Sequence, residues 1–298
     1  MIWVNQVVQG ILLGGYYALL ATGLSLLFGV MRIINLAHGD LAVVGLFLVW
    51  WLHDQGVSVT TAVVLMLPAM ALAGVVLQRV LLERSLRSGV LVPLLTTFGL
   101  AIVIQNLLFE KFGADIRSVD VGAFAYNGWK ITDQIYVGHL PVVTFCVAVA
   151  LLGTLQLFLS RAPLGRAMRA TAQDPDTAEL VGVNARAVYL AAAAIAVATA
   201  GLAGAFLGMR STFDAYVGPT QLIYAFEAVV IGGLGSLWGT LLGGIVIGVA
   251  QTVGAQLDPQ WSILTGHLVF LAVLGWRLVN GAVVGRGGMR AALGFGSS

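Results

Sequence analysis

Long apolar runs separated by short polar segments make up most of the chain. A membrane-spanning helix needs about 20 mostly apolar residues, and six runs have that length: 7–30, 59–82, 90–110, 138–159, 187–209 and 261–279. Three more runs are shorter or interrupted, at 34–52, 220–235 and 239–257. The pattern predicts an all-α polytopic membrane protein of one domain, 1–298, with about eight to nine transmembrane or re-entrant helices. Whether 34–52 and 220–257 cross fully is left open.

Small residues recur at a spacing of four in several runs: Gly10 with Gly14, Gly201 with Ala205, Gly239 with Gly243, and Gly244 with Gly248. This spacing allows helix backbones to approach closely in lipid, so these positions are predicted to pack helices together. The stretch GGLGSLWG at 232–239 interrupts an apolar run. Such a break fits a broken transporter helix near a substrate site or a simple reversal, and the orientation argued below favours a reversal.

Residues 161–186, RAPLGRAMRATAQDPDTAELVGVNAR, form a polar, basic segment between two apolar runs. The segment carries signals for a short helix of its own. Asp174 is a good N-cap, Pro175 suits the first helical position, and Glu179 adds negative charge near the N-terminus. Gly182 is placed to end the helix in the left-handed conformation. The pattern fits a docking element for a soluble partner and an ordinary cytoplasmic loop about equally well.

The composition assigns the chain to the membrane class. Of its 298 residues, 59% are hydrophobic and only 9% are charged, and the mean hydropathy is +0.96. Soluble domains carry roughly 25% charged residues, so a soluble protein is excluded. A net charge of +2 does not point to a nucleic-acid partner. Cys146, the single cysteine, can form no intramolecular disulfide and is predicted to be a small packing residue.

The positions of lysine and arginine predict the orientation, because cytoplasmic loops carry an excess of both. With the N-terminus outside and nine crossings, four of the 15 basic residues lie outside, namely Lys111, Arg117, Lys130 and Arg210. The other 11, which is 15 minus these four, then lie in the cytoplasm. This arrangement places the C-terminus and 161–186 in the cytoplasm and makes 111–137 an external loop. The N-terminal MIWVNQVVQG lacks a basic n-region, so the first span is expected to be retained.

The sequence contains no constellation typical of catalysis. The four histidines are scattered, and no spacing suggests a metal site. A phosphate-binding loop needs Gly-Lys followed by Ser or Thr, but neither Lys111 nor Lys130 follows a glycine. We therefore expect no enzymatic activity and no cofactor in this chain. If it takes part in ATP-driven transport, ATP is expected on another polypeptide.

A few polar residues lie within or between apolar runs and are candidates for a transport pathway. Arg32, Asn35, His38 and Asp40 occur in MRIINLAHGDL, where the alternative is an interfacial turn with His38 and Asp40 capping the next helix. Glu227 is surrounded by apolar residues in AFEAVVIGG. A charge at membrane depth costs roughly 2.5–3.5 kcal/mol on insertion scales and marks a functional candidate by default. Glu227 is therefore predicted to face the bundle interior or an interface between permeases rather than lipid.

Four segments in order resemble the permease subunits of branched-chain amino-acid ABC importers, and in particular the first of the two paralogous permeases. They are GGYYALLATGLSLLFGVMRIINLAHGDL (14–41), LLTTFGLAIVIQN (94–106), GRAMRATAQDPDTAELVGVN (165–184) and AVVIGGLGSLWGTLLGG (228–244). The C-terminal WRLVNGAVVGRGGMR departs from the family's pattern. The resemblance implies a permease of a bacterial inner membrane that imports branched-chain or related amino acids.

The resemblance also implies partners and a coupling site. The expected partners are a second paralogous permease, two cytoplasmic ATPases and an extracytoplasmic solute-binding protein. The segment 165–184 would sit in a groove of an ATPase, and its coupling residues would be Gly165, Arg166, Arg169, Asp174, Ala178, Glu179, Leu180 and Gly182. Within that set, Arg166 and Arg169 would pair with ATPase carboxylates, and Ala178 and Leu180 would make small apolar contacts.

Other functions stay open from the sequence. The same importer class includes permeases for urea, amides or small carboxylates, and nothing in the chain singles out one substrate. A stand-alone secondary transporter and a membrane scaffold are the competing classes. The shortage of acidic residues at membrane depth counts against the secondary transporter, and polar residues beside interrupted spans count mildly against the scaffold. A homodimeric and a heterodimeric permease core fit the sequence equally well.

Overall fold

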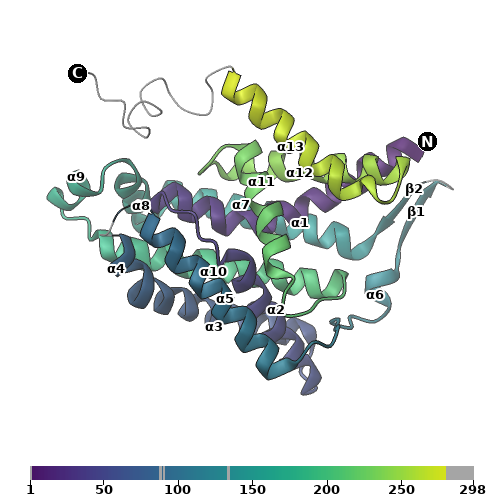
Figure 1. Cartoon of the computed structure of the whole chain (residues 1–298), viewed down its shortest axis with the longest axis horizontal. Coiled ribbons are helices and arrows are strands. Elements are labelled where there is room, and N and C mark those ends of the chain that lie inside the picture. Colours follow the sequence, from purple (N-terminus) through teal and green to yellow (C-terminus); the bar gives the residue numbers. More distant parts are fainter. Residues whose placement is uncertain (1, 87–88, 90, 133–134, 280–298) are drawn as a thin grey trace.

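The structure is a computed structural model that describes residues 2–86, 89, 91–132 and 135–279. Arg87, Asp133 and the tail from residue 280 onward, where the sequence departs from the family's pattern, lie outside the described residues. Helices dominate the described chain, which confirms the prediction of an all-α polytopic membrane protein (Figure 1).

Among the described residues, six helices are long and apolar enough to cross a membrane. They are α1 (Ile2–Met31), α5 (Leu91–Phe112), α7 (His139–Arg161), α10 (Ala185–Arg210), α12 (Leu237–Leu257) and a helix at Val59–Ser85 formed by α3 (Val59–Leu77), η1 (Gln78–Leu82) and α4 (Glu83–Ser85). The last helix, α13 (Trp261–Val279), contains a shorter apolar stretch. Run 239–257, expected to be short or interrupted, forms the full-length α12. The number of crossings stays a prediction.

Two helices are too short to cross alone and begin inside the molecule. α2 (His38–Asp54) has 17 residues and α11 (Gly218–Gly232) has 15, so they measure about 25 Å and 22 Å at 1.5 Å per residue. A hydrocarbon core is about 30 Å thick. The non-helical segments 32–37 and 211–217 precede them. Irregular backbone within a membrane is tolerated where protein surrounds it, and Asn35, Ala37 and Ala215 in these segments are buried in the protein.

The two halves of the chain repeat the same order of elements. α1 is followed by segment 32–37, α2 and α3, whereas α10 is followed by segment 211–217, α11 and α12. The halves exchange partners, since α1 packs most extensively on α12 and α10 packs on α3 and α2. α2 and α11 meet between them (Figure 1). The fold therefore brings the starts of two short helices together at its centre.

Glycines allow the closest of these helix contacts. A methyl group on Gly14 would overlap the backbone at Ile245, and one on Gly248 would overlap the carbonyl oxygen of Gly10. Gly201 lies against Met66 and Met70. The prediction that residues spaced by four pack the helices is confirmed for these positions. The turn at 233–236 joins α11 to α12, which confirms the reversal expected there.

The chain has two distinct ends. At the hairpin end, strands β1 (Gly128–Thr132) and β2 (Ile135–Gly138) form a small antiparallel sheet after α6 (Ala123–Tyr126). Gln9 near the start of α1 donates a hydrogen bond to the Tyr136 carbonyl there. At the α8–α9 end lie α8 (Pro163–Gln173) and α9 (Pro175–Leu180). The strands were not expected in the predicted external loop.

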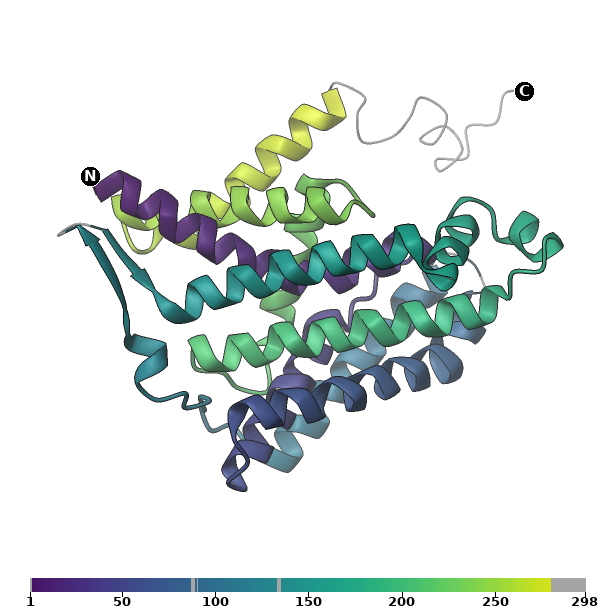
Figure 2. The same ribbon diagram turned by 180° about the vertical axis from the view of Figure 1, so that it is seen from behind.

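The two broad faces of the molecule differ. Figure 1 shows α5 and α11 on one face, and Figure 2 shows α7 and α10 on the opposite face. Cys146, expected to be a packing residue, is instead an exposed free thiol on α7. A helix at the periphery of the bundle has few neighbours to bury such a side chain.

Candidate functional site

The polar segment 161–186 forms two helices rather than one. The expected short helix is α9, and α8 precedes it. Asp174 caps α9 as predicted: its Oδ1 accepts from the backbone N–H groups of Asp176 and Thr177 at 3.1 and 3.2 Å. The Thr177 hydroxyl donates to the other carboxylate oxygen at 2.6 Å. These hydrogen bonds from Thr177 hold the pKa of the Asp174 carboxyl below its usual value.

The end of α9 also follows the prediction. Gly182 has φ +87°, and its N–H donates to the Glu179 carbonyl. Ala178 is buried within this chain, whereas Leu180 is 87% exposed and its neighbour Val181 is 75% exposed. Of the two apolar residues expected to face a partner, Leu180 projects outward. Ala178 packs inward, because it lies on the opposite side of the short helix.

α8 folds back on the end of α7. Gly165 permits the turn, since a methyl group there would overlap the Phe158 carbonyl oxygen. Arg166 and Arg169 are exposed and donate hydrogen bonds to the carbonyls of Arg161 and Ser160, at 2.8 and 3.4 Å. The last carbonyls of a helix lack partners within it, so these arginines stabilise the end of α7. Their exposed positions still suit an acidic partner.

The stretch that contains Asn35 and His38 is buried at the start of α2. The Asn35 side chain accepts from the Ala37 N–H at 3.0 Å. His38 Nε2 donates to the Leu20 carbonyl of α1 at 2.8 Å. Asn35 Nδ2 and His38 Nδ1 have no hydrogen-bond partner among the described residues. The segment is a turn before α2 whose side chains are buried inside the protein, and its position relative to the membrane stays a prediction.

Asp40, one of the ionisable candidates in MRIINLAHGDL, is buried in the first turn of α2. Its Oδ1 accepts from Gln105 Nε2 of α5 at 2.9 Å, and it lies against Gly218 at the start of α11. A carboxylate in the first turn of a helix is favoured by the helix dipole. The signal in the sequence was its place, as an ionisable residue, between two apolar runs. Asp40 thus joins α2, α5 and α11 at the centre of the fold.

Glu227 lies in the bundle interior, as predicted, and is 3% exposed. His267 of α13 donates from Nδ1 to Glu227 Oε1 at 2.5 Å, and the Tyr224 ring stacks on the imidazole. Further along, the Arg277 guanidinium donates to the carbonyls of Val230 and Ile231 at the end of α11. α13 therefore holds α11 through two polar contacts. The sequence showed these residues as scattered single polar positions.

The candidate residues fall into two groups. Arg166, Arg169, Asp174 and Gly182 lie at the α8–α9 end, whereas His38 and Glu227 lie on the two short helices that meet inside the fold. No hydrogen bond joins His38 to Glu227 among the described residues. Nor is any group of three or more His, Cys, Asp or Glu in that part of the chain placed to hold a metal ion.

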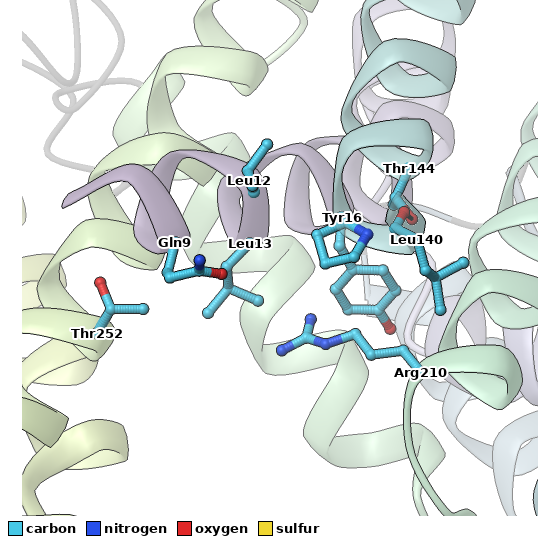
Figure 3. Close-up of a pocket in the computed structure, with 9 residues that line it drawn as sticks. Gln9, Leu12, Leu13, Tyr16, Leu140, Thr144, Arg210 and Thr252 are labelled. Atoms are coloured by element: carbon cyan, nitrogen blue, oxygen red, sulfur yellow. Dashed lines mark hydrogen bonds between the residues drawn. The ribbon is translucent and has the colours of Figure 1, made fainter. Parts of the chain in front are cut away.

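A cavity of about 250 Å³ lies elsewhere, among α1, α7, α10 and α12 (Figure 3). Arg210 lies beside the Tyr16 ring there, with 5.4 Å between the guanidinium carbon and the ring centroid. The Tyr16 hydroxyl donates to Gln221 of α11 at 2.8 Å. None of the residues predicted for coupling or for the pathway lines this cavity.

Comparison with known proteins gives a consistent result. A family model described as the permease component of branched-chain amino acid transport systems matches residues 6–274. The permease protein BraD of Pseudomonas aeruginosa PAO1, from a high-affinity branched-chain amino acid transport system, is 30% identical over 290 residues, with 91% of this chain and 93% of BraD covered. LivH of Escherichia coli K12, described in the same terms, is 27% identical, with coverage of 91% and 92%.

A second permease of that bacterium also matches over a shorter length. LivM of Escherichia coli K12 is 31% identical over 145 residues, which cover 46% of this chain and 33% of LivM. No solved structure matches the chain.

Proposed function

Because the chain belongs to the family of permease components of branched-chain amino acid transport systems, we propose that it forms half of the translocation pathway of an ATP-driven importer. It is a multi-pass membrane permease subunit, and its proposed cargo is a branched-chain or related amino acid. The proposed partners are a second, paralogous permease, two ATPases that bind ATP, and a solute-binding protein. The match over nearly the whole chain, residues 6–274, carries this proposal.

The pathway is proposed to follow the face that α11 and α5 share. On this face α11 packs against α2, and both short helices carry a buried carboxylate, Asp40 on α2 and Glu227 on α11. Each carboxylate has a polar partner on the second helix after its own, counting Val59–Ser85 as one helix: Gln105 on α5 for Asp40 and His267 on α13 for Glu227. Polar groups at membrane depth are costly and mark transport pathways. We propose that Glu227 on α11 and Asn35 and His38 near the start of α2 belong to the substrate pathway.

The function is tested by reconstitution. The chain is purified with its genomic neighbours, placed in liposomes with the solute-binding protein, and assayed for uptake of radiolabelled leucine. Uptake that requires ATP and all subunits supports the proposal. Uptake by this chain alone, abolished by a protonophore, would instead identify a secondary transporter. ATP-dependent uptake of urea, an amide or a small carboxylate but not of leucine would overturn the proposed cargo and support the proposed ATP-driven import.

The orientation gives a first prediction. In a Cys146→Ala background, we expect Leu180→Cys on α9 to react with a membrane-impermeant maleimide only after the membrane is opened. Lys130→Cys in β1 should react in intact cells. Both positions are exposed, so access depends on the side of the membrane. The reverse labelling pattern would contradict an external N-terminus and a cytoplasmic α8–α9 end.

The coupling segment gives a second prediction. Replacing Arg166 and Arg169 by glutamate should weaken co-purification of the ATPases several-fold, because exposed charges that face an acidic partner become repulsive. Gly182→Val should also impair coupling, since a β-branched residue is strained at φ +87°. Lys130→Glu, a charge reversal at the hairpin end, is the matched control. If ATPase recovery and uptake stay unchanged in the Arg166, Arg169 and Gly182 variants, this segment does not dock the ATPases.

A further inference from the structure

Arg32 stands where α1 ends and segment 32–37 begins. Its φ is +55°, and it is the one non-glycine residue in the described chain with a positive φ. Glycine adopts this conformation without steric cost, whereas other residues are strained there. Backbone strain of this kind clusters at switch regions and is retained when the surrounding structure enforces it. Contacts of the Arg32 side chain are therefore expected to hold the backbone in this conformation.

The Arg32 side chain reaches α8. Its Nη2 donates to the carbonyl of Ala172, in the last turn of that helix, at 3.1 Å. Carbonyls in a last helical turn lack partners within the helix and favour a cation. Within the described chain, this is the only hydrogen bond between residues 163–184 and the part of the chain before α7. The arginines of α8 itself bond to the end of α7 instead.

Segment 32–37 connects this contact to the centre of the fold. The Leu36 N–H donates to Thr97 Oγ1 of α5 at 3.1 Å, and His38 then bonds to the Leu20 carbonyl. Gly39, the next residue, lies so close to Gly218 at the start of α11 that a methyl group would overlap its carbonyl oxygen. Only five residues, 33–37, lie between Arg32 and His38. A shift of α8 can therefore displace the contact between the starts of α2 and α11, because the connecting segment is short.

We propose that Arg32 is a positioning residue that transmits movement of α8 to the junction of α2 and α11. This inference rests on the proposed function, in which ATPases dock at the α8–α9 end. The arginine side chain connects α8 to segment 32–37 through its hydrogen bond to Ala172. The left-handed backbone at Arg32 turns the chain from the end of α1 toward the buried start of α2. Loss of the side chain would leave the ATPases bound and active while separating ATP hydrolysis from transport.

The experiment follows the movement itself. In the reconstituted importer with Cys146→Ala, a single cysteine at Leu36→Cys reports on segment 32–37 by its rate of maleimide labelling, with and without ATP and vanadate. With Arg32 present, ATP and vanadate change the rate. With Arg32→Ala or Arg32→Gly the change is lost, and substrate moved per ATP hydrolysed falls at least about fivefold, the lower end of typical coupling factors. Arg32→Lys, which keeps a donor, restores part of both.

Two controls make the result decisive. Arg79→Ala removes another exposed arginine, in η1, and should leave labelling and transport per ATP unchanged. If Arg32→Ala fails to assemble, Arg32→Gly decides, because glycine relieves the strain. An unchanged transport-to-ATP ratio or a persisting ATP-dependent labelling change in assembled Arg32→Gly overturns the inference. A wild-type chain that binds no ATPase overturns the proposed function as well, so the two failures are distinguishable.

Discussion

Gly39→Ala is expected to abolish ATP-driven uptake. The added methyl group would overlap the Gly218 carbonyl oxygen and would also crowd the Leu222 backbone nitrogen. Overpacking usually costs about 1–3 kcal/mol, and the upper part of that range is expected because backbone atoms cannot rotate away as a side chain can. The starts of α2 and α11 would be forced apart, and Asp40 would lose its place beside Gly218.

The matched control is Gly153→Ala in α7, where a methyl group meets nothing within 4 Å. Alanine is favoured over glycine inside a helix by roughly 0.5–1 kcal/mol, so this variant should keep full uptake and melt slightly higher. Thermal unfolding in detergent and ATP-driven uptake in liposomes measure both effects. Wild-type uptake by Gly39→Ala would show that the junction of the two short helices tolerates separation and has no role in transport.

Glu227→Leu should lower both stability and uptake, whereas Glu227→Gln should assemble normally and alter uptake alone. Glutamine keeps an oxygen that accepts from His267, but leucine leaves the imidazole without its partner. A buried polar group left unpaired costs about 1–3 kcal/mol. The lower half of that range is expected, because the His267 side chain is 36% exposed and water can reach it. A lower melting temperature for Glu227→Leu is the measurement.

A double-variant cycle separates the loss of the Glu227–His267 hydrogen bond from the other effects of replacing Glu227 by leucine. If the contact with His267 is the cause, adding His267→Leu to Glu227→Leu should cost little more, because neither polar partner then remains. Additive losses would assign Glu227 a role apart from His267. Wild-type uptake and melting in both Glu227 variants would make the residue incidental to transport.

Local features of the chain were predictable because their causes lie within a few residues. Asp174 caps α9 through the two N–H groups that follow it, and Gly182 ends that helix at positive φ. The long apolar runs became helices because length and composition alone decide whether a segment suits lipid. α12 was the exception, since its many glycines resembled breaks. Gly244 and Gly248 instead lie against α1, which is far away in the sequence, and Gly243 lies against α11.

The pathway residues depended on contacts across the chain. Glu227 was identifiable as a carboxylate in an apolar run, but its partner His267 stands 40 residues away and Gln105 stands 65 residues from Asp40. Hydrophobic periodicity shows which residues enter the membrane and carries no information on which helix each will meet. The burial of segment 32–37 was likewise hidden, because a turn inside the protein looks like a surface turn in a sequence.

The sequence by itself determined that this is a helical membrane protein, where its apolar helices lie and how the α9 helix is capped. These properties follow from residue chemistry summed over short windows. Only the tertiary structure decided that the chain repeats its arrangement, that α2 and α11 begin against each other, and that Arg32 bonds to Ala172, 140 residues away. Such contacts arise because close packing of glycine-rich helices selects one arrangement among many that the apolar runs alone would permit.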